Sequence, residues 1–183
     1  MFKSSLIALS LIIGLSAAPA FAKNPTVGGA AMFPNKNIIQ NAVNSPINTT
    51  LVAAVKAAGL VETLSGPGPF TVLAPTNAAF DALPAGTVAT LLKPENKATL
   101  VKILTCHVIA GNVMAKDVMS MVKADGGSHT VTTVGGCKVT FTTSAGKVYV
   151  TDEKGNKARV TTANVRQSNG VIHVINKVLL PKM

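Results

Sequence analysis

The residues of this sequence that could do chemistry are three histidines, two cysteines and seven carboxylates. Cys106 stands directly before His107, an order that suggests a thiol nucleophile with a neighbouring base. A catalytic thiol needs that base within hydrogen-bond reach. The segment "TCHVIAG" predicts a strand, in which adjacent side chains point to opposite faces, so Cys106 and His107 are not expected to act together.

The other reactive groups show no spacing that is typical of a metal site or a catalytic centre. The cysteines and histidines lack C-x-x-C and H-x-x-x-H spacing. Asp152 and Glu153 fall in a predicted turn, where we expect solvated carboxylates rather than an acid–base pair. Nucleophile elbows, phosphate loops and dinucleotide fingerprints are missing from the sequence. We therefore expect no enzyme activity, no metal and no cofactor.

His173 lies in the apolar segment "SNGVIHVINKVLL", which has the pattern of a strand. Alternation places His173 on the same face as Val171 and Ile175. A histidine on such a face is expected to be buried, with its ring nitrogens bonded to backbone or amide groups. The alternative is a ligand or catalytic role for the same ring.

Cys106 and Cys137 are the two cysteines of the chain. On the predicted strands Cys106 shares a face with Val108, and Cys137 shares one with Val139, so both thiols should point to the core. In an exported protein two such cysteines favour a disulfide. Two buried free thiols are the alternative.

The first 22 residues have the pattern of a secretory signal peptide. A lysine at position 3 precedes an apolar run, and the small-residue pattern Ala20-Phe21-Ala22 predicts cleavage after Ala22. The other interpretation, a membrane-spanning helix, requires a longer apolar segment. We therefore expect a secreted or periplasmic protein without a transmembrane segment in its mature form.

The charge of the chain is strongly basic but dispersed. Without residues 1–22 there are 16 basic and 7 acidic residues, a formal net charge of +9. Only 13% of residues are charged and 4% are aromatic, whereas nucleic-acid binders concentrate charge and interleave aromatic side chains. We therefore expect anionic surfaces, such as acidic polysaccharide or membrane head groups, as partners instead of nucleic acid.

The pattern of apolar residues divides the chain into a helical front and a stranded back. Residues 23–36 are expected to form a linker, and 37–183 a single domain. Helical spacing dominates to about residue 124, and from His129 onward the period changes to alternation with glycine-containing turns. Helices followed by consecutive hairpin strands indicate an α+β fold.

Three segments of the sequence resemble the signature boxes of the fasciclin (FAS1) domain family. They are "FTVLAPTNAAFDAL" at 70–83, "LTCHVIAG" at 104–111 and "SNGVIHVINKVLLP" at 168–181. Their order and separation are those of the family, and the likeness runs from about Phe33 to Pro181. Single-domain secreted bacterial members are the most similar type.

This resemblance implies a β-sandwich or wedge with several helices packed at one side. It implies extracellular adhesion or surface interaction, with no cofactor and no reaction. In the family the first box packs against the last, with an asparagine and a histidine in a buried polar network. By position these residues are Asn77 with His107 or His173, so the resemblance gives the histidines a structural role.

Two departures from the family pattern limit what the resemblance implies. The middle box usually has a tyrosine before its histidine, and Cys106 stands there instead. Some animal members bind integrins through an aspartate–isoleucine pair before the last box, where this chain has Asn164 and Val165. We therefore do not expect integrin-type recognition.

Two functions follow as expectations from the sequence and the resemblance. The first is an exported, non-enzymatic FAS1-domain protein that mediates contact with a cell surface, matrix or envelope, through a protein or an anionic polysaccharide. The alternative is a periplasmic protein that binds a small molecule or lipid in an apolar cleft between helices and sheet. The pattern of residues indicates no particular contact surface.

Overall fold

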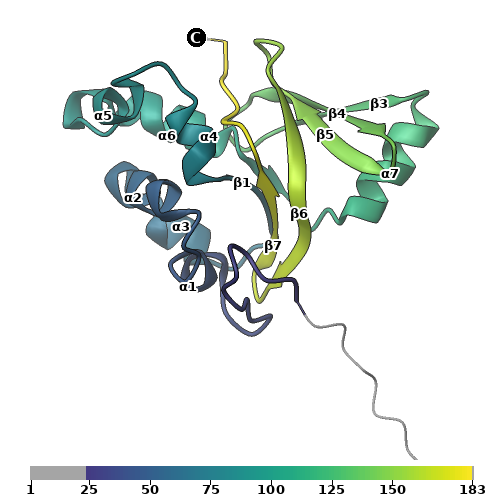
Figure 1. Cartoon of the computed structure of the whole chain (residues 1–183), viewed down its shortest axis with the longest axis horizontal. Coiled ribbons are helices and arrows are strands. Elements are labelled where there is room, and N and C mark those ends of the chain that lie inside the picture. Colours follow the sequence, from purple (N-terminus) through teal and green to yellow (C-terminus); the bar gives the residue numbers. More distant parts are fainter. Residues whose placement is uncertain (1–23, 183) are drawn as a thin grey trace, which may run out of the picture.

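A computed structural model describes residues 24–182 of the chain (Figure 1). The expected signal peptide, residues 1–22, lies outside the described residues. The elements in chain order are α1 (Ile38–Ala42), α2 (Thr49–Ala58), α3 (Val61–Ser65), β1 (Phe70–Pro75), α4 (Asn77–Asp81), α5 (Thr87–Leu91), the 3₁₀ helix η1 (Pro94–Asn96), α6 (Lys97–Thr105), β2 (Val108–Ala110), α7 (Ala115–Ala124), β3 (Ser128–Thr132), β4 (Lys138–Ser144), β5 (Lys147–Thr151), β6 (Lys157–Gln167) and β7 (Gly170–Ile175).

Helices α1 to α6 gather on one side of the sheet (Figure 1). Helix α2 shows why the sequence folds this way, because its buried residues Leu51, Ala54, Val55 and Ala58 recur at helical spacing and form one apolar stripe. Gly59 ends this helix with φ of 73°, a left-handed conformation that glycine adopts without steric cost.

The strands form one seven-stranded sheet in the order β2-β1-β7-β6-β5-β4-β3. Strands β3 to β7 follow one another as antiparallel neighbours, while β1 lies parallel to β7, with Phe70 opposite Gly170 and Pro75 opposite Ile175. The expected α+β fold, with helices first and hairpin strands after them, is confirmed. The first box therefore packs directly against the last.

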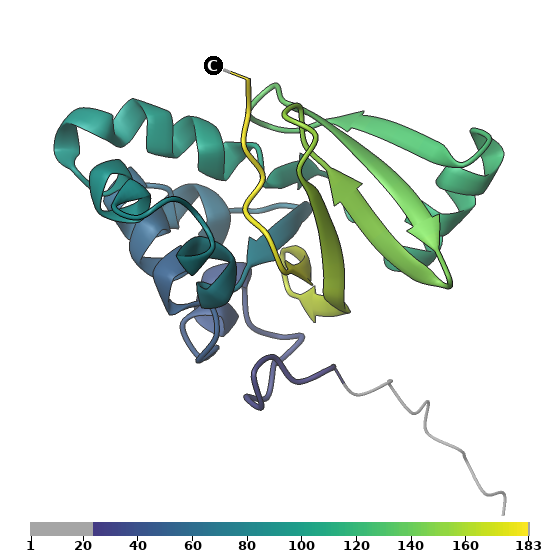
Figure 2. The ribbon, with the colours of Figure 1, turned by 45° about the horizontal axis from the view of Figure 1, so that its top comes forward.

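Two hydrophobic cores lie on opposite faces of the central strands β1 and β7. Alternate residues, such as Val72 and Val174, face the helices α1 to α6 in the first core. Their neighbours Leu73 and Ile175 belong to the second core, together with Val118 and Val122 of α7. Figure 2 shows α7 behind the curled strands β3 to β5. Strand β7 is buried along its whole length because it serves both cores.

The segment at 24–36 takes part in the first core. We expected 23–36 to be a linker, but Val27 and Met32 are only 3% and 5% exposed and belong to that core. A backbone bridge between Val27 and Ala30 holds this segment in a turn. Among residues 24–182, none of the helices combines the length and the apolar character that crossing a bilayer requires.

Candidate functional site

His107 follows Cys106, the C-cap residue of α6. It is buried where that helix, strand β1 and the C-terminal segment, residues 176–182, meet. Its Nδ1 donates to the carbonyl of Ile103 (2.8 Å), and its Nε2 accepts from the backbone N–H of Leu179 (2.9 Å). Its own carbonyl accepts from Leu73 N–H (2.8 Å). Because Nε2 must accept, the ring is neutral with its proton on Nδ1.

Burial lowers the pKa of His107 to about 4, although the hydrogen bond to the Ile103 carbonyl and the negative charge of Asp152 act in the opposite direction. A charged ring is disfavoured here because it would lose both water and the bond from Leu179. His107 therefore joins α6, β1 and the C-terminal segment by hydrogen bonds, and both ring nitrogens are bonded to backbone groups.

His173, in the middle of β7, has the reverse pattern of hydrogen bonds. Its Nε2 donates to the carbonyl of Val113 (2.8 Å), and its Nδ1 accepts from Asn164 N–H (3.2 Å). Burial lowers the pKa of this imidazole. Asn164 has a left-handed φ of 61° within the irregular part of β6, so the ring supports a bulged backbone.

Asn77 begins α4 and fastens it to the segment that leads into α2. Its Oδ1 accepts from Thr50 N–H (3.0 Å) and its Nδ2 donates to the Pro46 carbonyl (3.2 Å). In the described part of the chain no hydrogen bond joins Asn77 to His107 or His173. The expected single network is therefore wrong in one respect, because these three residues hold three separate junctions.

Cys106 and Cys137 are joined by a disulfide, with their Cα atoms 5.4 Å apart. The strand that we predicted for Cys106 is wrong, since the residue caps the C-terminus of α6 and β2 begins only at Val108. The apolar spacing of Leu100, Ile103 and Leu104 extends the helix to this point. The bond therefore ties a helix end to the residue that precedes β4.

Asp152 is a structural residue that sequence reasoning missed. We expected a solvated carboxylate, but the residue is 7% exposed. One oxygen accepts from the N–H groups of Lys154 and Asn156, and the other accepts from the Asn156 side chain and from Leu180 N–H (2.7 Å). The local sequence Asp-x-x-Gly-Asn is typical of such a turn, but the bond to Leu180 depends on the tertiary fold.

Other buried amides bind distant backbone in the same manner. Asn41, which is fully buried, bonds the backbone of Phe33 and the side chain of Gln167. Asn169 accepts from Ile38 N–H and donates to two carbonyls, those of Leu64 and Gly66. Their positions in loops and short helices gave no periodic signal that could have identified them.

The reactive side chains do not assemble into a centre. Within residues 24–182, no three histidine, cysteine, aspartate or glutamate side chains lie close enough together to hold a metal ion. The sequence-predicted residues are instead spread over both cores and over the junctions between elements. In this arrangement the buried polar side chains supply hydrogen-bond partners to backbone groups inside the fold.

An apolar cavity of about 40 Å³ lies between helices α1 to α3 and strands β1 and β7. Val52, Val55, Leu64 and Ile172 are among its lining residues, and His107 also lines it. The volume is that of a small group rather than of a whole drug-sized ligand. Polar atoms make up almost none of its surface.

Comparison with known proteins connects this fold to a family. The sequence model of the fasciclin domain matches residues 47–181. The chain belongs to the fasciclin domain family. A solved FAS1 domain pair from the insect cell adhesion molecule Fasciclin I has the same fold, with a TM-score of 0.72 at 19% identity. The match covers 80% of this chain and about half (51%) of that two-domain structure.

Bacterial fasciclin-domain relatives are more similar in sequence. Protein sll1483 of Synechocystis sp. is 51% identical over 161 residues, which are 88% of this chain and 82% of that protein. Cell surface glycolipoprotein MPT83 of Mycobacterium tuberculosis is 36% identical over 176 residues, or 93% and 72% of the two chains. Family membership and the expected FAS1 wedge are thus confirmed.

The role of His173 in this fasciclin domain leads to a test by substitution. His173→Gln should keep most of the stability because an amide can both donate to Val113 and accept from Asn164. His173→Leu leaves both backbone groups buried and unpaired, at a cost of roughly 1–3 kcal/mol more than glutamine. Urea unfolding at pH 7.5 measures the difference, and equal stabilities of the two variants would contradict the assignment.

Proposed function

We propose that this fasciclin-domain protein is exported and acts without catalysis, through contact of its surface with a cell envelope, matrix or partner cell. The observation that supports the proposal is that its reactive side chains are bonded to other groups inside the fold. Both buried histidines, both cysteines and Asp152 are bonded inside the fold, which leaves the exterior to interact. The cell-surface name of the mycobacterial relative MPT83 agrees with such a role.

Retention by envelope material tests this proposal. The purified protein is immobilised and incubated with envelope fractions of its host at low salt, where electrostatic contacts between exposed groups are least screened. We expect specific envelope components to be retained, and to be released as salt is raised. An unrelated domain of similar size and net charge serves as the control, and equal retention by both proteins, or by neither, would contradict the proposal.

A second candidate function is the binding of a small apolar molecule in the periplasm. The apolar cavity between α1 to α3 and the sheet favours it, because the cleft lies where such a ligand was expected. Its modest volume suits a short acyl or ring group inserted from the surface, rather than an enclosed ligand.

Filling the cavity tests the second candidate. In Val52→Phe the larger side chain occupies part of the cavity, whereas Val43→Phe places the same ring on an exposed position outside it. If an apolar ligand binds there, native mass spectrometry of protein from the host should show a bound species in the wild type and in Val43→Phe. The Val52→Phe protein should lose at least tenfold in occupancy, and the absence of a ligand from all three proteins would rule this function out.

A further inference from the structure

Strands β3 to β6 have one face covered and one face free. Helix α7 packs against β3, β4 and β5, and residues such as Val139, Phe141 and Val150 are buried beneath it. The alternate residues, beginning at Ser128, Lys138, Lys147 and Lys157 in the four strands, lie on the opposite face, as the alternating burial along each strand indicates. We name this side, up to Arg159 in β6, the outer face.

The strand register arranges the side chains of the outer face in rows. In one row Thr130 lies opposite Thr140, which lies opposite Thr151, and Lys157 ends the row. Neighbouring strands are about 4.8 Å apart, and successive rows are separated by two residues, or roughly 7 Å. The face is therefore a regular grid of short hydroxyl side chains with cations at its ends.

The neighbouring row of the grid contains an aromatic ring. Ser128, Thr142, Tyr149 and Arg159 lie opposite one another in order. The ammonium group of Lys157 sits 4.7 Å from the centre of the Tyr149 ring. This contact holds the ring and the charge together in one cation–π pair on the outer face.

The charge of the outer face has one sign. Lys138, Lys147, Lys157 and Arg159 are exposed on it, and strands β3 to β6 contain no aspartate or glutamate. Glu153 borders it in the β5–β6 turn, where its carboxylate is engaged by the N–H groups of Lys138 and Lys182. An anionic partner would meet four cations and little opposing charge.

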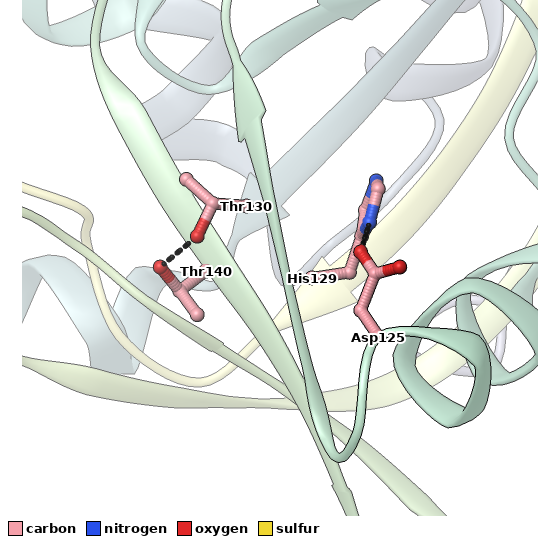
Figure 3. Close-up of polar contacts among 4 residues, drawn as sticks. All are labelled: Asp125, His129, Thr130 and Thr140. Atoms are coloured by element: carbon pink, nitrogen blue, oxygen red, sulfur yellow. Dashed lines mark hydrogen bonds and ion pairs between the residues drawn. The ribbon is translucent and has the colours of Figure 1, made fainter.

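The titratable pair nearest to β3 belongs to the other side of the sheet. His129 Nδ1 donates to the carboxylate of Asp125 (2.6 Å), at the end of α7, and its strand partner Phe141 is buried in the second core. Figure 3 shows this pair next to the end of α7 and apart from the bonded pair Thr130 and Thr140, whose hydroxyl oxygens are 2.9 Å apart. The described residues of the outer face therefore include no histidine.

The hydroxyl groups of the outer face can exchange hydrogen bonds with a sugar. Each threonine hydroxyl is both a donor and an acceptor. Among the side-chain atoms that the structure describes as buried, Thr142 Oγ1 alone lacks a hydrogen-bond partner, and it lies at the middle of the grid. That atom is itself buried, so a hydroxyl-rich polymer would bond the exposed hydroxyls of β3, those of Ser128, Thr130 and Thr132.

We propose that the outer face of β3 to β6 binds an acidic polysaccharide, an inference that rests on the proposed surface-contact function. Lysine and arginine would pair with its anionic groups, with arginine able to hold a carboxylate by two parallel bonds. The polymer hydroxyls would bond the threonine rows. A lipid surface fits less well, because the outward side chains of the face include no large aliphatic group that could insert among acyl chains.

Two matched double variants test the assignment. Lys157→Gln/Arg159→Gln removes two cations of the outer face, and Lys93→Gln/Lys97→Gln removes two from the helical side, so both proteins have the same net charge. Binding of purified protein to polygalacturonate is measured by isothermal titration, with uncharged dextran as the neutral polymer. We expect the outer-face variant to raise Kd about tenfold, equivalent to about 1.4 kcal/mol, and the helical-side variant less than twofold.

Each other result has a definite meaning. If the wild-type protein does not bind polygalacturonate but binds vesicles containing anionic phospholipid, the partner is a membrane and the inference is wrong. If both double variants weaken binding equally, net charge rather than the outer face is responsible. If envelope material retains the wild type and the outer-face variant equally, this inference fails while the surface-contact function stands. Circular dichroism of both variants verifies that they are folded.

Discussion

Removing the disulfide is expected to lower the free energy of unfolding by about 4 kcal/mol, the value that chain entropy gives for cysteines 31 residues apart. The bond holds the C-terminus of α6 against the start of β4, so it joins the helical half to the hairpin half. Cys106→Ala/Cys137→Ala is the suitable variant, because both positions are buried and alanine introduces no unpaired hydroxyl. For a domain of this size the melting temperature should fall by roughly 10 °C.

Reduction provides the internal control for this prediction. The wild-type protein in excess reductant should become as unstable as the double alanine variant, while the variant itself should not respond to reductant. Thiol titration of the denatured, unreduced protein should detect almost no free thiol. Two free thiols per chain, or a melting temperature that reductant leaves unchanged, would show that the cysteines are not bridged in the native protein.

Acidification is expected to destabilise the protein well before its carboxylates are protonated. The pKa of His107 is lowered from 6.5 to about 4 in the folded state, so between these pH values the unfolded chain binds the proton and the folded chain does not. The stabilising contribution is complete above pH 6.5 and is lost as pH falls toward 4. Its size is roughly 3 kcal/mol.

His173 acts in the same direction, because burial lowers its pKa as well. Urea unfolding at pH 7.5, 5.5 and 4 measures the combined slope. His107→Gln should flatten it, since an amide does not titrate, and the double variant with His173→Gln should flatten it further.

The tautomers give an independent measurement. Nitrogen NMR should find the proton on Nδ1 of His107 and on Nε2 of His173, with the His107 ring neutral at pH 6. A His107 ring that titrates near 6.5, or wild-type stability that is constant from pH 7.5 to 5, would show that the ring is exposed to solvent.

These effects share one physical basis. Three buried polar side chains form hydrogen bonds with backbone groups that are distant in the sequence. His107 accepts from Leu179, His173 donates to Val113, and Asp152 accepts from Leu180. Loss of one such bond leaves a buried backbone group without a partner, which costs more than the bond itself contributes.

The amino-acid sequence by itself determined the local elements. Alternation from His129 onward predicted the hairpin strands, since period two is a property of the strand backbone. The segments at 70–83 and 168–181 indicated the family, and their expected packing is the parallel pairing of β1 with β7. Near Cys106 the local pattern misled, because the short stretch that follows the apolar residues of α6 fits a helix end as well as a strand. It also misled at 24–36, where the expected linker contributes Val27 and Met32 to the first core.

The tertiary structure alone decided which groups meet. The spacing of residues in the sequence did not predict that Asn77 lies apart from both histidines or that Asp152 is buried under the C-terminal segment. It also did not predict that four cations lie on one face of β3 to β6. These outcomes depend on strand register and on contacts between chain segments that are distant in the sequence, such as the bond from Leu180 N–H to Asp152, 28 residues away. Local propensity acts over a few residues, so it cannot specify contacts that exist only after the chain has folded.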